Sequence, residues 1–380
     1  MSFGIIDPDT PQEAMSYASP TDGSTMYLVF SDEFNVDGRS FYPGDDPFWE
    51  ALDLHYWGTN NLEWYDPSAI TTRNGALQIT LSQVAFPESN HNMSYRGGML
   101  TTWNKFCFTG GMLLASVTLP GSSNVAGLWP AVWTLGNLGR AGYGSTLDGL
   151  WPYSYDACDV GTLKNQTLNG KPVAATRNGD TRFDGALSFL PGQRLSRCTC
   201  PGESHPGPMY TDGSYMGRAA PEIDAVEAQV GDGVGHVSQS GQWAVSWNVA
   251  ELAQLELISF FEPFNEAYQW SNESTNYIIY NTAVTKWNDY KGGVYQQAVS
   301  AVSETDQNCY ELNTGCFSTY GFEYKPGYDN AYITWINDNK PSWTLFSAGV
   351  GPDPAVEIAA RSIPEEPMVT PYLRESRPLK

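Results

Sequence analysis

The amino-acid sequence predicts an all-β fold, and two features of its composition support that class. Aromatic residues make up 13% of the 380 residues and include 22 Tyr and 13 Trp, which favour strands over helices. The 37 Gly and 25 Pro indicate frequent turns and therefore many short strands. No internal repeat and no Ser/Gly linker divides the chain. Because single large β-sandwiches reach this length, we expect one domain with a sizeable core.

Individual strands are predicted from short runs that are apolar or that alternate apolar and polar residues. The clearest alternating run is Ala76-Leu-Gln-Ile-Thr-Leu81. In chain order, the predicted strands cover residues 27–30, 76–81, 111–119, 129–135, 222–230, 242–249, 276–283, 293–302, 319–324 and 331–336.

The remaining segments predict how the domain is organised. Residues 1–25 are rich in Pro, Asp and Ser and are expected to form an N-terminal arm. Residues 40–68 combine many aromatics with Asp, Gly and Pro, as is typical of loops over a sheet. Residues 136–220 form a long Gly/Pro/Ser/Asp-rich loop, and a loop of that length inside a domain is usually functional. Residues 250–262 are predicted as a helix.

The charge excludes one class of partner. The formal net charge is -22, whereas a nucleic-acid binder needs a basic face. We therefore expect no nucleic acid. An acidic surface rich in aromatics suits neutral ligands such as sugars, but the charge serves solubility equally well.

The six cysteines suggest disulfides rather than a metal site. No CxxC pair has a matching partner pair, so a structural zinc site is not predicted. Cys309 and Cys316 are close enough in sequence for a disulfide, and Cys158 has Cys198 or Cys200 as candidate partners. Six cysteines allow about 15 pairings, so the connectivity stays open.

Three N-glycosylation sequons, at Asn92, Asn165 and Asn272, favour a secretory compartment when taken with the cysteines. No apolar run is long enough to span a membrane, since the most apolar stretch, residues 255–261, is short. The first residues carry no signal peptide. A body of secreted character without an export signal predicts a further segment upstream.

The segment Pro221-Glu-Ile-Asp-Ala-Val-Glu227 carries three carboxyl groups. Side chains alternate along a strand, so Glu222 and Asp224 share a face and Glu227 points away from it. One extra residue at 225–226, a β-bulge, returns Glu227 to that face. Carboxyls this close cannot all ionise freely, so the pKa of at least one rises and a proton donor stands beside an ionised nucleophile. Glycosidases use this arrangement, with the two carboxyls about 5–5.5 Å apart in retaining enzymes.

A solvated acidic strand edge is the alternative interpretation of these carboxyls. In a chain of 380 residues with 42 acidic ones, the expected number of chance occurrences of an acid-x-acid-x-x-acid pattern is about 0.5. For the strict order Glu, Asp, Glu the expected number is about 0.06. The motif alone is therefore moderate evidence for a glycosidase site.

Two tryptophans lie four residues apart in Gly127-Leu-Trp-Pro-Ala-Val-Trp133. On a bent strand, Trp129 and Trp133 can form the floor of a groove and stack on sugar rings. Burial in the core is the commoner fate of tryptophan. Trp103 allows the same two interpretations.

Other catalytic chemistries lack their motifs. The four histidines show no HExxH spacing, so no catalytic metal is expected. No GxSxG elbow supports a serine hydrolase. Gly231-Asp-Gly-Val-Gly235 lacks the third glycine of a dinucleotide-binding loop and is predicted as a turn.

The carboxyl motif at 222–227 and the tryptophan motif at 129–133 together resemble glycoside hydrolase family 16 in its bulged-strand form. The sequence resembles more closely the fungal β-glucan-synthesis-associated branch of that family, of the Skn/Kre type. The similarity runs from about residue 5 to residue 368. Segments that carry it include Leu28-Val-Phe-Ser-Asp-Glu-Phe-Asn35, Phe41-Tyr-Pro-Gly-Asp-Asp-Pro47, Trp103-Asn-Lys-Phe-Cys-Phe108, Trp151-Pro-Tyr-Ser-Tyr-Asp-Ala-Cys-Asp159 and Cys198-Thr-Cys-Pro-Gly202.

The resemblance implies a concanavalin-like β-jelly-roll sandwich with long loops over a concave cleft. It implies Glu222 as nucleophile, Glu227 as acid/base and Asp224 as the residue that tunes the nucleophile. Trp103, Trp129 and Trp133 become substrate-binding candidates. The implied function is retaining hydrolysis or transglycosylation of β-1,3- or β-1,6-glucan in fungal cell-wall biogenesis, without a cofactor.

Members of this branch are typically type II membrane proteins of the secretory pathway. The resemblance therefore implies a location at the cell surface or wall, with membrane association only through a segment outside this chain. A calcium ion on the convex face occurs in relatives but is not predicted here.

The resemblance also sets the domain boundaries. We expect the catalytic domain at residues 26–368, followed by an atypical tail at 369–380, which is basic, contains Pro and is unlike a core strand. From this ending we expect C-terminal strands of the sandwich to be lacking, as in a truncated or mis-spliced reading frame. A non-catalytic glucan-binding or scaffold protein of wall assembly is the second functional hypothesis.

Overall fold

The computed structural model describes residues 4–56, 59, 61–137, 139–142, 220–243, 274–288, 297–350 and 362–376. Several expectations lie outside the described residues. These are the helix at 250–262, nearly all of the loop at 136–220, Cys158, Cys198 and Cys200, and the sequons at Asn165 and Asn272.

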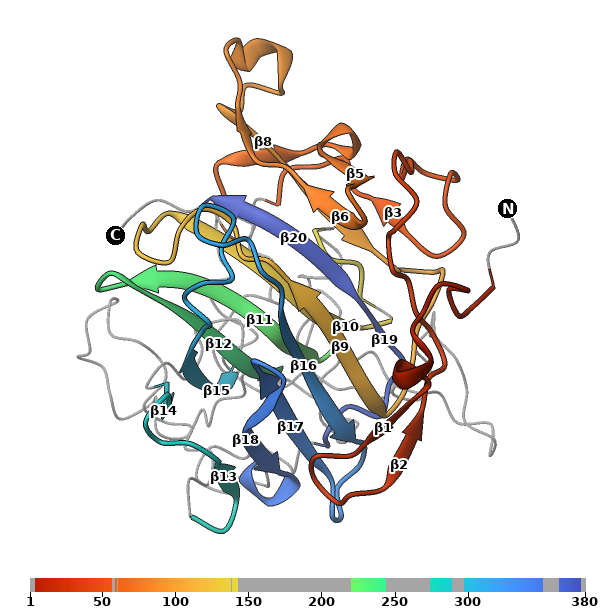
Figure 1. Cartoon of the computed structure of the whole chain (residues 1–380), viewed down its shortest axis with the longest axis vertical. Coiled ribbons are helices and arrows are strands. Elements are labelled where there is room, and N and C mark those ends of the chain that lie inside the picture. The colour runs from red at the N-terminus through yellow and green to blue at the C-terminus, as the bar shows by residue number, and fades with distance from the viewer. Residues whose placement is uncertain are drawn as a thin grey trace, which may run out of the picture.

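Two mainly antiparallel sheets dominate the fold, and the exception is β4, which pairs with β8 in parallel (Figure 1). The larger sheet runs in the order β14-β15-β12-β11-β10-β20-β8-β3, with β19 beside β10 and with β4 and β7 beside β8. Its strands are β3 (Glu50–Ala51), β4 (Glu63–Tyr65), β7 (Ser82–Gln83), β8 (Tyr95–Thr101), β10 (Leu128–Gly136), β11 (Glu222–Gly231), β12 (Val234–Trp243), β14 (Thr285–Trp287), β15 (Gln297–Glu304), β19 (Met368–Val369) and β20 (Pro371–Ser376).

The smaller sheet has five strands in the order β13-β18-β17-β16-β9. They are β9 (Gly111–Val117), β13 (Tyr277–Ile279), β16 (Ser318–Lys325), β17 (Tyr332–Asn337) and β18 (Lys340–Phe346). Two hairpins lie outside both sheets, β1 (Ser16–Ala18) with β2 (Thr25–Tyr27) and β5 (Ile70–Arg73) with β6 (Ala76–Ile79). The helices described are short 3-10 turns at Gln12–Met15, Pro67–Ala69, Pro87–Ser89 and Ser347–Val350. In the described part of the chain, no helix has the length and apolar character to cross a membrane.

The main core lies between the two sheets. Apolar side chains of β10, β11, β12 and β15 pack there against those of β16, β17 and β18. Trp335 and Trp343 stack at 4.0 Å between ring centroids, and both are fully buried. Trp335 Nε1 also donates to the backbone oxygen of Asp224 at 2.8 Å, which ties the smaller sheet to β11. The predicted all-β jelly-roll sandwich is thereby confirmed.

Most predicted strands are present, and the misplaced ones have physical reasons. The prediction of a strand at 27–30 was wrong beyond Tyr27, because Phe30 leaves the hairpin to stack on Phe106 at 4.3 Å. The strand predicted at 242–249 begins earlier, at Val234. The sequence does not show its alternation because a polar residue, Gln239, occupies a core-facing position, where its amide donates to the backbone oxygens of Ala225 and Ile336. The strand predicted at 276–283 ends at Ile279, before a turn.

The turn predicted at 231–235 joins β11 to β12. Asp232 and Gly233 have φ angles of 51° and 75°, and Gly231 pairs with Val234 on either side of them. Positive φ at both central residues is the geometry of the tight two-residue hairpin turn. This turn fixes the register of β11 against β12, and so decides which residues face each other in the site described below.

Residues 371–376 lie within the larger sheet and not in a tail, contrary to expectation. They form β20, which pairs with β10 on one side and β8 on the other, so that Leu373 faces both Ala131 and Met99. Pro371 opens the strand, where its missing N–H is tolerated. Tyr372 packs on Trp49 at 5.4 Å between centroids. The expectation that 369–380 is a tail unlike a core strand was wrong for residues 371–376, because pairing with β10 and β8 places them inside the larger sheet.

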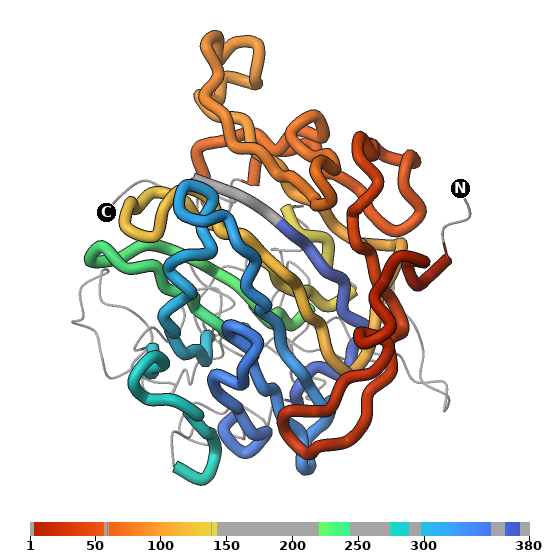
Figure 2. The backbone as a smooth tube through the Cα atoms, in the orientation of Figure 1, coloured from red at the N-terminus to blue at the C-terminus, as the bar shows by residue number. Residues whose placement is uncertain are grey.

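The predicted N-terminal arm is attached to the outer face of the smaller sheet, as Figure 2 shows where the red tube crosses the blue strands. Glu323 is fully buried beneath it and accepts hydrogen bonds from Ser19 and Thr21 of the arm and from Tyr332. Thr21 also bonds Thr334 at 2.7 Å. These contacts make the arm part of the fold.

Candidate active site

A β-bulge at Ala225–Val226 shapes strand β11. Asp224 lies opposite Ser240 of β12 and Glu227 lies opposite Ser238, so three steps on β11 match two on its partner. The pairing with β10 shifts at the same point. The bulge expected from the sequence is therefore present, at the expected position.

The bulge sets which side chains face the core. Ile223, Ala225, Val226 and Ala228 all belong to the core between the sheets. Their neighbours Glu222, Asp224 and Glu227 consequently share the opposite face. Glu222 and Asp224 are buried at 8% and 1% exposure, whereas Glu227 is half-buried. The structure thus brings the three carboxyls onto one face of the larger sheet.

Asp224 is the centre of a hydrogen-bond network. Ser240 Oγ donates to Asp224 Oδ2 at 2.5 Å, and Gln242 Nε2 donates to the same oxygen at 3.1 Å. A further hydrogen bond joins Asp224 to Glu222. The two carboxyls can therefore share a proton, which lets one stay ionised beside the other.

Burial raises the pKa of Asp224 above its ordinary value, and the hydrogen bonds from Glu222, Ser240 and Gln242 oppose that rise. Desolvation is the larger effect because Asp224 is almost completely removed from solvent. A proton is thus retained within the Asp224–Glu222 pair to higher pH than on an isolated aspartate.

Trp129 contacts the third carboxyl. Its Nε1 donates to Glu227 Oε1 at 3.3 Å. Trp129 and Ala131 are two residues apart on β10 and therefore share one face of the sheet. Ala131 lies directly opposite Glu227. The predicted substrate-binding Trp129 therefore lies beside the predicted acid/base.

Trp133 and Trp103 belong to a second apolar cluster on the same face as the carboxyls. Trp133 lies opposite Asp224 across β10 and β11 and is 4% exposed. Trp103 is half-buried, and the Arg140 guanidinium lies 4.3 Å from its ring centroid. Neither indole N–H has a hydrogen-bond partner among the described residues. Buried donors of this kind are satisfied by ligand or water.

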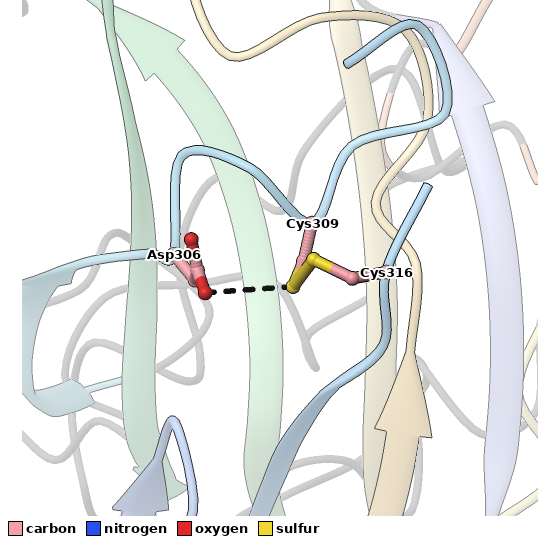
Figure 3. A group of neighbouring side chains, drawn as sticks. All are labelled: Asp306, Cys309 and Cys316. Atoms are coloured by element: carbon pink, nitrogen blue, oxygen red, sulfur yellow. Dashed lines mark hydrogen bonds between the residues drawn. A yellow bond between two sulfur atoms is a disulfide. The ribbon is translucent and has the colours of Figure 1, made fainter. Parts of the chain in front are cut away.

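The structure places Asp306, Cys309 and Cys316 together, away from the carboxyls, and Figure 3 shows why they are no metal centre. Cys309 and Cys316 form a disulfide with a Cα–Cα distance of 4.4 Å, which confirms that pairing. Disulfide sulfurs are neither thiolates nor S–H donors, so the 3.5 Å approach of Cys309 Sγ to Asp306 Oδ2 is a contact without a shared proton.

Ser240 and Gln242 were missed from the sequence. The available signal was that Ser238, Ser240 and Gln242 stand at every second position after the turn and therefore share one face of the strand. A hairpin alignment from the Asp232–Gly233 turn, corrected by one residue for the bulge, places Ser240 opposite Asp224.

A model of the family described as beta-glucan synthesis-associated protein SKN1/KRE6/Sbg1 matches residues 1–371. The chain is 44% identical over 369 residues to the beta-glucan synthesis-associated protein KRE6 of Saccharomyces cerevisiae, covering 96% of this chain and 44% of that protein. It is 27% identical over 277 residues to the endo-1,3-1,4-beta-glycanase EglC of Rhizobium meliloti, and the match covers 59% of this chain and 56% of that protein. An endo-beta-1,3-glucanase structure from Pyrococcus furiosus aligns with a TM-score of 0.48 at 14% identity, covering 96% of this chain and 89% of that one.

The chain is a β-sandwich protein, built from the two sheets described above. It belongs to the SKN1/KRE6/Sbg1 family. The chain spans less than half the length of the curated relatives it matches first.

Proposed function

We propose that this chain carries a retaining glycosidase site that cleaves or transfers β-glucan. Glu222 acts as the nucleophile and Glu227 as the acid/base. The observation that carries the proposal is the bulge at 225–226, which puts both glutamates on one face with Asp224 between them. A regular strand would direct Glu227 into the core.

The chemistry needs two steps. The Glu222 carboxylate attacks the anomeric carbon while Glu227 gives its proton to the departing glycosidic oxygen, which leaves a glycosyl ester on Glu222. Glu227, now ionised, removes a proton from water or from a sugar hydroxyl. That oxygen then displaces Glu222 and restores the β-linkage or releases the sugar. The hydrogen bond between Asp224 and Glu222 helps the latter to leave.

Aromatic side chains on the carboxyl face suit a glucan. Trp133 and Trp103 lie in one cluster there, and Trp129 reaches Glu227. Sugar rings stack their apolar faces on such side chains, while the free indole N–H groups can bond hydroxyls. The names of the relatives indicate β-glucan as the ligand, so β-1,3- and β-1,6-linked glucans of the fungal cell wall are the substrates proposed here.

The proposed location is the cell surface or secretory pathway, with membrane attachment through a segment outside this chain. Asn92, in the sequon Asn92-Met-Ser94, is exposed and lies in a turn, where a glycan can be added. Secretion from a fungal host should add a glycan that endoglycosidase removes. Asn92→Gln and Ser94→Ala should each reduce the mass by one glycan, and an unchanged mass in both would contradict use of this sequon.

Defined β-1,3- and β-1,6-gluco-oligosaccharides test the function directly. The chain is incubated with each, and shorter and longer products are both measured. Shorter products alone identify a hydrolase, and longer products identify a transferase. Glu222→Gln should lower either rate at least about a thousandfold, because the nucleophile is lost. Glu88→Gln is the matched control. Glu88 is exposed and distant in sequence from Glu222, so this variant should keep the wild-type rate.

A non-catalytic glucan-binding or scaffold role is the second candidate. It is favoured by the relatives' description, which names association with β-glucan synthesis and no hydrolytic reaction. Binding of the oligosaccharides without shorter or longer products would support it. Product formation that Glu222→Gln leaves unchanged would overturn the catalytic assignment instead.

A further inference from the structure

Two side chains of strand β12 hold one oxygen of Asp224. Ser240 Oγ and Gln242 Nε2 both donate to Asp224 Oδ2, and Gln242 Nε2 also donates to Ser240 Oγ at 3.2 Å. We propose that Ser240 and Gln242 are positioning residues, which fix Asp224 in the orientation that hydrogen-bonds Glu222. This inference rests on the proposed function, because it assigns how the nucleophile is tuned.

The strand register explains why these two residues can do this. Ser240 lies directly opposite Asp224, so a short hydroxyl side chain reaches it. Gln242 lies opposite Glu222, and its longer side chain crosses diagonally to Asp224. Both are buried, at 1% and 5% exposure, so water does not compete for these bonds. Because a carboxylate only accepts hydrogen bonds, the amide nitrogen of Gln242 must face it.

The surroundings of Asp224 contain no positive partner among the residues that the structure describes. On its own strand the charged neighbours are Glu222 and Glu227. Trp133 of β10 faces it from one side and Ser240 from the other. His236, the histidine of β12, lies opposite Gln229 and further along the strand. The two donors from β12, Ser240 and Gln242, are neutral and do not titrate. The loss of either donor should therefore change the apparent pKa of the Asp224–Glu222 pair directly.

Ser240→Ala and Gln242→Met each remove one donor while preserving approximate size. Both should move the acidic limb of the pH–rate profile upward by about one pH unit, because a donor that stabilises the charged form is lost. They should lower kcat about tenfold and leave KM within about twofold. Ser240→Thr retains the hydroxyl and should recover most of the wild-type profile.

Ser300→Ala is the matched control. Ser300 lies opposite Ser240 on the next strand, β15, and is also buried, but its hydroxyl has no hydrogen-bond partner among the described residues. It should retain the wild-type profile. If Ser240→Ala and Gln242→Met behave like Ser300→Ala, the positioning role is wrong.

A second measurement does not depend on turnover. Carbon-13 NMR of the labelled carboxyls gives the apparent pKa values of the Asp224–Glu222 pair, identified by their loss in Asp224→Asn. Both donor variants should raise the pair's apparent pKa by about one pH unit. If the wild type turns over nothing, the proposed function fails and this titration still decides the positioning role. Circular dichroism checks that each variant is folded. If Ser240→Ala does not fold, the titration of Gln242→Met decides the positioning role.

Discussion

Trp129 and Glu227 meet across strands β10 and β11, where the indole Nε1 donates to the carboxylate oxygen Oε1 at 3.3 Å. The contact joins an aromatic side chain suited to sugar stacking to the carboxyl proposed as acid/base. An N–H donor favours the ionised form of a carboxyl over the protonated form. In the proposed mechanism, substrate binding and proton transfer therefore depend on the same pair of side chains.

Replacing Trp129 by Phe should displace the basic limb of the pH–rate profile to higher pH. The ring remains but the donor is lost, so Glu227 keeps its proton longer as the pH rises. The displacement should be about half to one pH unit, as for one hydrogen bond to a charged group. Initial rates on a β-1,3-gluco-oligosaccharide between pH 4 and pH 8 measure it. A lower rate with an unmoved basic limb would show that Trp129 acts only through stacking.

Asp224→Asn should change how stability depends on pH. Burial raises the pKa of Asp224 in the folded protein above the ordinary value of 3.8, so above pH 3.8 the folded state holds more protons than the unfolded state. The free energy of unfolding therefore falls as the pH rises from about 4 through the raised pKa. Asparagine cannot titrate and should flatten this decline.

Urea unfolding at several values between pH 4 and pH 7 tests that difference. The wild-type midpoint should drop over this range by more than that of Asp224→Asn. Parallel curves for the two proteins would mean that Asp224 titrates as it does in the unfolded chain, and that its charge is not a source of instability.

Deletion of Val226 should leave Glu227 on the carboxyl face. Without the extra residue, Glu222, Asp224 and Glu227 stand at every second position, so a regular strand directs all three to the same face. The deletion also removes the buried Val226 side chain, so the free energy of unfolding should fall by about 1.5–3 kcal/mol. Thermal unfolding and oligosaccharide turnover report stability and activity separately. Turnover as low as that of Glu222→Gln in a folded deletion variant would argue against this register.

Cys309→Ser with Cys316→Ser should lower the free energy of unfolding by about 2–3 kcal/mol, the loop-closure value for a short loop. The disulfide closes a loop with a sequence separation of 7. The loop is tied to residues 119–121 by backbone hydrogen bonds, in which Leu119 N–H donates to Cys309 O and Leu312 N–H donates to Gly121 O. The loss should therefore be structural and leave KM unchanged. Urea unfolding with and without reductant measures it, and a wild type insensitive to reductant would contradict the estimate.

The site was predictable from sequence where a local rule acts. Alternation plus one extra residue placed Glu222, Asp224 and Glu227 on one face, and the same alternation placed Trp129 and Trp133 together. These relations depend only on neighbours in the chain. They remain true whichever strand lies alongside.

Long-range relations were not predictable in that way. β20 lies between β10 and β8, and nothing in its own composition indicates partners so distant in the sequence. Ser240 and Gln242 were missed because their role depends on register against β11. A serine and a glutamine carry no chemical signature of their own. Only the pairing with Asp224 makes them informative.

The position of β20 also has a consequence for the order in which the protein folds. Residues 95–101 and 128–136 are synthesised early, yet they join the same sheet through a strand at 371–376. The pairing edges of β8 and β10 must therefore wait while most of the chain leaves the ribosome. Contacts between such distant segments form slowly and leave strand edges open to other chains meanwhile. The larger sheet can therefore close only after synthesis has passed residue 376.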